Sequence, residues 1–84
     1  MDLLDPKTVP ERVVKRSVRV AGHRTSVTLE AAFWPVLIGL AEARGQSLDA
    51  LVTEVDAARR GNLSSALRVF VLRALRDAAP DAHH

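Results

Sequence analysis

The sequence contains no cysteine and very few aromatic residues: its 84 residues include one tryptophan, two phenylalanines and no tyrosine. The absence of cysteine excludes disulfide bonds and thiolate metal sites, and it fits a reducing cytoplasm. Because aromatics make up only 4% of a chain that is 48% apolar, the core must consist mainly of leucine, valine and alanine side chains on helices. The composition therefore predicts one small, mainly α-helical domain.

The sequence also lacks the patterns that mark membrane proteins and common enzymes. Its longest apolar runs are too short to cross a bilayer, and its N-terminus lacks the basic and then apolar pattern of a secretion signal. It has no phosphate-binding glycine loop, pair of catalytic carboxylates, zinc-ligand spacing or nucleophile–base set. We therefore expect a cytoplasmic protein that does not contact a membrane, is not an enzyme, and holds no metal or cofactor.

One stretch lacks acidic residues altogether. Residues 12–29 contain none, although the whole chain has a net charge of only +2. Within the stretch, apolar residues alternate with basic and hydroxyl-bearing residues, which is the period of a strand with one covered and one open face. A basic, hydroxyl-rich face can bind phosphates and base edges, and a β-ribbon is slim enough to enter a DNA major groove. The stretch therefore predicts binding to double-stranded DNA.

Ala21 and Gly22 interrupt the alternating stretch and allow two arrangements. The segment can fold into a hairpin on itself, with Gly22 supplying a positive φ in a tight turn. Alternatively, it can run as one extended strand that pairs with the same segment of a second chain. We favour the second arrangement, because a lone two-stranded hairpin is marginal in water, whereas symmetric pairing adds backbone hydrogen bonds and a shared apolar surface.

The rest of the chain divides into an arm, a domain and a tail. Residues 1–14 contain two prolines and no sustained period, so we expect a flexible N-terminal arm. Residues 15–77 form the domain, and residues 78–84 form a disordered C-terminal tail.

Three helices are expected in the domain. The first should begin near residues 28–30 and end at Arg44-Gly45, and the third should follow Asn62. Pro35 is costly inside a helix, so either the regular part of the first helix begins near Trp34 or its first turn is distorted. Ser47 is a good N-cap for the second helix, which leaves free amides at its start. Those amides could bind an anion, but an ordinary capped helix explains the same residues equally well.

The order and spacing of four segments carry a family resemblance. These segments are Thr25–Glu30, Phe33-Trp34, Glu54–Asp56 with Arg59, and Asn62–Phe70. Over about residues 15–76, they resemble the short bacterial ribbon-helix-helix proteins of the Arc/methionine-repressor-like superfamily. The resemblance implies a mainly α fold with a short N-terminal β-strand, forming an intertwined homodimer, here with an extra C-terminal helix.

The resemblance also implies how DNA is bound. One strand from each chain forms an antiparallel ribbon, this ribbon lies in the major groove, and the start of the second helix clamps a backbone phosphate. The base-reading positions would be Arg24, Ser26 and Thr28, with Ser17 and Arg19 if the strand extends back. The phosphate clamp would be the amides of Gln46, Ser47 and Leu48. We expect further phosphate contacts from Lys15 and Arg16.

Together these features predict a dimeric DNA-binding protein that acts as a transcriptional repressor or autoregulator. Its expected partners are double-stranded DNA and a second copy of itself, with higher-order assembly on DNA also open. An alternative is an antitoxin-like or scaffold dimer that binds a protein partner and has little or no DNA binding. The low net charge and the broadly apolar third helix motivate this alternative.

Overall fold

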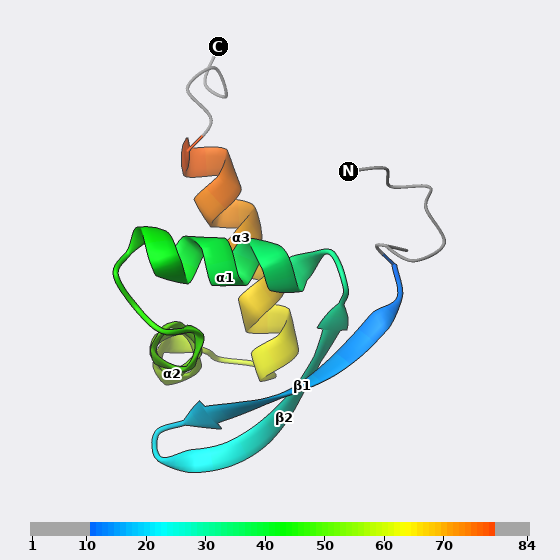
Figure 1. The fold of residues 1–84 in the computed structure, drawn as a ribbon, viewed down its shortest axis with the longest axis vertical. Helices are drawn as coiled ribbons and strands as arrows, with labels where there is room; N and C mark the ends of the chain where they lie inside the picture. The colour runs from blue at the N-terminus through cyan, green and yellow to red at the C-terminus, as the bar shows by residue number, and fades with distance from the viewer. Residues whose placement is uncertain (1–10, 79–84) are drawn as a thin grey trace.

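The computed structural model describes residues 11–78, which form a two-stranded antiparallel sheet followed by three helices (Figure 1). The predicted ribbon and the three predicted helices are thus confirmed. The predicted arm and tail lie mostly outside the described residues, although β1 begins before the expected boundary at residue 15. The elements are β1 (Val13–Val20), β2 (His23–Glu30), α1 (Phe33–Ala43), α2 (Leu48–Ala58) and α3 (Leu63–Ala78).

The two strands of the ribbon belong to one chain and form a hairpin. The arrangement that we favoured, one extended strand paired only with a second chain, is therefore wrong, and the alternative hairpin is found. Ala21 has φ 51° and Gly22 has φ 86°, so both central residues of the two-residue turn are left-handed. This is the backbone of a type I′ turn, whose twist matches that of the flanking strands. Helices packed on one face then supply the stability that an isolated hairpin lacks.

The register of the hairpin separates two faces. Val14, Val18, Val27 and Leu29 point to the inner face, which the helices cover. The opposite side carries only polar and basic side chains between residues 15 and 28, all of them exposed, and we call it the outer face. The outer face consists of Lys15, Ser17, Arg19, Arg24, Ser26 and Thr28.

The core lies between the inner face and the three helices, which share one side of the ribbon (Figure 1). Its centre consists of leucines, one from each element after β1, and each of them is completely removed from solvent. Burying a leucine side chain contributes on the order of 1.5–3 kcal/mol, so these contacts are the main force that holds the helices on the ribbon. The leucines are Leu29, Leu37, Leu51 and Leu67.

Helix α1 begins at Phe33, close to the alternative start near Trp34 and not near residues 28–30, because β2 continues to Glu30. Pro35 consequently lies in the first turn, where a missing N–H removes no helical hydrogen bond. At the other end, Gly45 has φ 69°, and the amide of Gln46 donates to the carbonyl of Ala41 over 2.8 Å. The predicted left-handed stop at Gly45 is therefore confirmed.

The starts of α2 and α3 are capped by the residues that the sequence indicates. The Ser47 hydroxyl accepts a hydrogen bond from the amide of Ala50 over 3.0 Å. The Asn62 side-chain oxygen accepts one from the amide of Ser65 over 2.8 Å. Each cap satisfies one backbone donor that the first turn leaves without a partner.

Candidate nucleic-acid interface

The outer face of the ribbon brings the predicted base-reading residues together. Ser17 lies opposite Ser26, and Arg19 lies opposite Arg24. Thr28 lies opposite Lys15, which was predicted as a phosphate contact. Strand alternation puts all of these side chains on one side, because successive residues point to opposite faces. The result is a narrow exposed strip of cations and hydroxyls.

Arg19 and Arg24 form a cross-strand pair of like charges at the turn end of the strip. Both side chains are exposed, and no ion pair within residues 11–78 involves either of them. Like charges placed directly opposite each other across a ribbon are destabilising. A polyanion lying along the strip would neutralise both guanidinium groups.

Arg16 is separated from the other predicted phosphate contacts. It lies two residues before Val18 on β1 and so belongs to the same face as Val18, opposite to the outer face. Its guanidinium carbon lies 5.7 Å from the centre of the Trp34 ring. Trp34 is only 4% exposed, and its ring nitrogen donates a hydrogen bond to the carbonyl of Val14 over 3.1 Å. Arg16 thus contacts the junction between β1 and α1 through a cation–π interaction rather than joining the outer face.

The start of α2 packs beside the edge of β1. The Asp49 carboxylate accepts a hydrogen bond from the amide of Arg19 over 3.1 Å, and the Thr53 hydroxyl lies 3.4 Å from the carbonyl of Arg19 and from the amide of Ala21. The predicted clamp residues Gln46, Ser47 and Leu48 therefore lie on the helix end that contacts this edge of the ribbon. Gln46 itself bridges the side chains of Arg44 and Glu54.

The charge at the start of α2 is mixed. Asp49 in the first turn complements the positive end of the helix dipole. The same carboxylate would repel a phosphate approaching the amides of Ser47 and Leu48, although it accepts a hydrogen bond from the amide of Arg19. The amide of Gln46 already donates to the carbonyl of Ala41.

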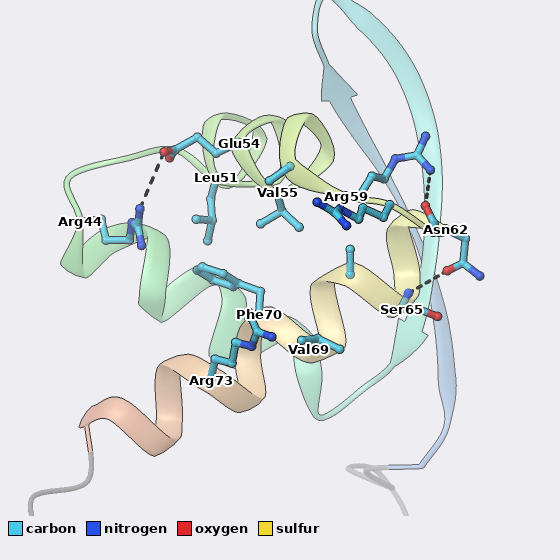
Figure 2. Close-up of a pocket in the computed structure, with 14 residues that line it drawn as sticks. Arg44, Leu51, Glu54, Val55, Arg59, Asn62, Ser65, Val69, Phe70 and Arg73 are labelled. Atoms are coloured by element: carbon cyan, nitrogen blue, oxygen red, sulfur yellow. Dashed lines mark hydrogen bonds and ion pairs between the residues drawn. The ribbon is translucent and has the colours of Figure 1, made fainter.

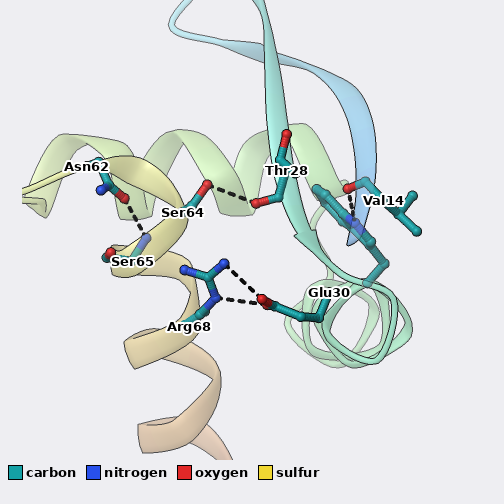
Figure 3. Close-up of polar contacts among 8 residues, drawn as sticks. Val14, Thr28, Glu30, Asn62, Ser64, Ser65 and Arg68 are labelled. Carbon is teal, nitrogen blue, oxygen red and sulfur yellow. Dashed lines mark hydrogen bonds and ion pairs between the residues drawn. The ribbon is translucent and has the colours of Figure 1, made fainter. Parts of the chain in front are cut away.

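The start of α3 lies against β2 and was not among the predicted site residues. The Ser64 hydroxyl donates to the carbonyl of Thr28 over 3.0 Å (Figure 3). A hollow of about 640 Å³ with a mixed polar and apolar lining lies between β2 and this end of α3, and it continues onto Ser26 and Thr28 of the outer face. The first turn of α3 contains no acidic residue, in contrast to that of α2. Among the other residues that line the hollow are Arg59, Asn62 and Arg68.

Arg68 links α3 to the end of β2 through two hydrogen bonds to Glu30 (Figure 3). The nitrogen–oxygen distances are 2.9 Å and 3.2 Å. These hydrogen bonds lower the pKa of Glu30 below its ordinary value, because they stabilise the ionised carboxylate. Glu30 is thereby neutralised by Arg68 at the end of an otherwise basic ribbon.

The sequence model of the ribbon-helix-helix domain family matches residues 13–75 of this chain. This range contains both strands, α1, α2 and most of α3. The chain belongs to the ribbon-helix-helix family. Ribbon-helix-helix domains are a DNA-binding fold and not an enzymatic one, and the described residues of this member contain no group of side chains able to hold a metal ion. In residues 11–78, no helix has the length and apolar character needed to span a membrane.

A solved structure supports the assignment. The ribbon-helix-helix chain is similar to an uncharacterized protein from Bordetella pertussis Tohama I, with 32% sequence identity and a TM-score of 0.69. The similarity covers 89% of this chain and 69% of the other. No curated protein matches the sequence at a significant level.

Proposed function

We propose that this ribbon-helix-helix protein is a sequence-selective DNA-binding regulator that acts in the cytoplasm as a repressor or autoregulator. The outer face of the ribbon enters the major groove, where Arg19 and Arg24 can each donate two hydrogen bonds to the O6 and N7 atoms of a guanine. Ser17, Ser26 and Thr28 provide hydroxyls for neighbouring base edges or phosphates. The single observation that carries this proposal is the exposed pair of arginines, which form no ion pair with any of residues 11–78, on a strip that contains no carboxylate.

In this proposal, phosphate contacts flank the strip. Lys15 extends it at the end away from the turn, and the start of α2 lies beside Arg19. The amides of Ser47 and Leu48 would then bind the DNA backbone next to the groove that the ribbon occupies, whereas the amide of Gln46 already donates to the carbonyl of Ala41. We assign Arg16 to packing on Trp34, because its guanidinium lies over that ring.

We further propose that two copies bind DNA together, each through its own hairpin and not through the shared ribbon that the family resemblance implies. A symmetric dimer would place two ribbons on neighbouring half-sites and would double the number of base contacts. The outer face gives DNA binding a dedicated surface, so we prefer this function to that of a scaffold dimer that has lost DNA binding.

The proposal is tested by selecting DNA from a pool of genomic fragments with the full chain and measuring binding by fluorescence anisotropy. We expect one class of sites to be enriched and bound at least about a thousandfold more tightly than random DNA. Affinity should fall steeply with salt, because neutralised phosphates release counterions. Failure to bind any fragment at low salt, or equal affinity for all fragments, would contradict the proposal.

Dimer formation is tested separately by analytical ultracentrifugation with and without the selected site. A protein that is monomeric in both samples, and that binds DNA with a stoichiometry of one, would contradict the dimer but not the base-reading role of the ribbon.

A further inference from the structure

A second surface lies between α2 and α3, where an apolar groove of about 580 Å³ opens to solvent (Figure 2). Its apolar lining comes from Leu51 and Val55 of α2 and from Val69 and Phe70 of α3. Val69 is 46% exposed, so part of its aliphatic side chain faces solvent in the groove. The groove therefore leaves apolar area that the described part of the chain does not cover.

Arginines surround this groove, which we call the arginine-rimmed groove. Arg44 pairs with Glu54 and lies over the Phe70 ring, 5.7 Å from its centre. Arg59 pairs with Asp56 over 2.6 Å. The lining also includes Arg60 and Arg73, and no ion pair among residues 11–78 involves either of these two. The rim thus carries positive charge beyond what its own carboxylates neutralise.

We propose that the arginine-rimmed groove binds an acidic amphipathic helix of a partner protein. Apolar side chains on one face of such a helix would cover Val55, Val69 and Phe70, in the manner of a helix laid into a groove. Carboxylates on its flanks would pair with Arg60 and Arg73. Charge complementarity selects this occupant, because a basic partner would be repelled by the rim.

The same charge argument disfavours a second copy of the chain packed groove to groove. A symmetric interface brings each patch onto itself, so it would place the excess positive charge of one rim against the same excess charge of the other. The partner helix is also compatible with DNA binding, because no residue of the groove lies on the ribbon. The protein could therefore hold DNA on one face and a partner on another.

The experiment uses the full chain and a labelled synthetic peptide of about four helical turns, with leucines on one face and glutamates on both flanks. A second peptide has lysines in place of the glutamates, and a third has the acidic sequence scrambled. The groove variant is Arg60→Glu with Arg73→Glu. The matched control is Arg12→Glu with Arg76→Glu, which changes the net charge equally at exposed arginines outside the groove. Circular dichroism checks that each variant keeps its helices.

We expect the acidic peptide to bind the native chain and to bind the groove variant about tenfold or more weakly. The control variant should stay within about threefold of the native chain, since remote exposed charges are screened by salt. The lysine peptide should prefer the groove variant. Val69→Gln should weaken the acidic peptide without altering affinity for DNA.

Three results would overturn the proposal. The first is that the scrambled peptide binds as tightly as the unscrambled acidic peptide. The second is that the control and groove variants lose affinity for the acidic peptide equally. The third concerns a second copy. The chain has no cysteine, so a Val69→Cys variant can form a disulfide only with position 69 of another copy. Rapid, complete crosslinking of that variant would show that a second copy occupies the groove.

Discussion

Arg19 and Arg24 face each other across the turn end of the ribbon, with both side chains exposed. This pair should lower stability and raise DNA affinity at the same time. Replacing Arg24 with threonine should raise the free energy of unfolding by roughly 0.2–1 kcal/mol, because it removes the repulsion and adds a residue that favours strands. The same change should weaken the preferred site about 5- to 150-fold and flatten sequence preference, because a bidentate guanine contact is lost. Urea denaturation and fluorescence anisotropy measure the two effects.

Lys15→Thr is the matched control for Arg24→Thr. It also replaces a cation of the outer face with threonine, but Lys15 lies opposite a neutral residue, Thr28. We expect it to weaken all DNA similarly and to reduce the slope of log affinity against log salt by about 1. If Arg24→Thr destabilised the fold, or left sequence preference intact, the functional interpretation of the arginine pair would be wrong.

The contact between Glu30 and Arg68 should make stability depend on pH. Because the pKa of Glu30 is lowered in the folded protein, its contribution is fully present above the ordinary value of 4.5 and is lost as the pH falls through the lowered pKa. Glu30→Gln should therefore destabilise the protein at about pH 7 and by less at about pH 3, because the difference from the native chain shrinks as the pH falls toward and through the lowered pKa. Urea denaturation at both pH values gives the difference.

Glu42→Gln provides the comparison for that measurement, because Glu42 is exposed and its side chain forms no ion pair within residues 11–78. It should change stability little at either pH. An equal effect of the two substitutions would show that general charge balance, rather than the contact with Arg68, sets the pH dependence.

Ala21 should lower the stability of the hairpin. An alanine at φ 51° is strained, whereas asparagine tolerates this conformation and Asn-Gly is the favoured pair for a type I′ turn. Ala21→Asn should therefore stabilise the protein by roughly 0.5–1 kcal/mol, and Gly22→Ala should destabilise it by about 1 kcal/mol or more. Thermal and urea denaturation test both. A loss of stability in Ala21→Asn would argue that the turn adopts another backbone conformation in solution.

Trp34 should contribute a hydrogen bond in addition to its apolar burial. In Trp34→Phe most of the apolar packing is kept, but the half-buried carbonyl of Val14 loses the donor that lies 3.1 Å away. The expected cost is roughly 1–2 kcal/mol, measured by circular dichroism because the only tryptophan is removed. A cost below about 0.3 kcal/mol would mean that water replaces the indole at the carbonyl.

Much of the fold follows from local signals in the sequence. Alternation in the acid-free stretch predicts the ribbon, and Gly45, Ser47 and Asn62 mark a helix end and two helix starts that the structure confirms. The partner of the strand could not be predicted in this way, because a period of two specifies which face is covered but not which strand lies alongside. The hairpin depends on Ala21, because the tight turn requires this residue to be left-handed, which is rare for alanine. The contact of its amide with Thr53 supports that conformation.

The candidate site also contains some residues that local sequence patterns predict and others that they do not. The outer face could be predicted from alternation alone, and the same parity, applied to Arg16, would have placed that residue on the opposite face from Arg19. Ser64 and Arg68 could not be recognised, since their contacts with Thr28 and Glu30 join segments far apart in the sequence. The arginine-rimmed groove likewise depends on how α2 and α3 pack, which no local pattern specifies.

The turn at Ala21-Gly22 has a consequence for redesign. When a ribbon is assembled from two copies of one strand, symmetry repeats every substitution in both halves. Here the facing strands are encoded by different codons of one gene, so the residue opposite Arg24 can be changed while Arg24 is left alone. An engineer could therefore give the two strands different side chains and direct each half of the surface toward a different ligand group.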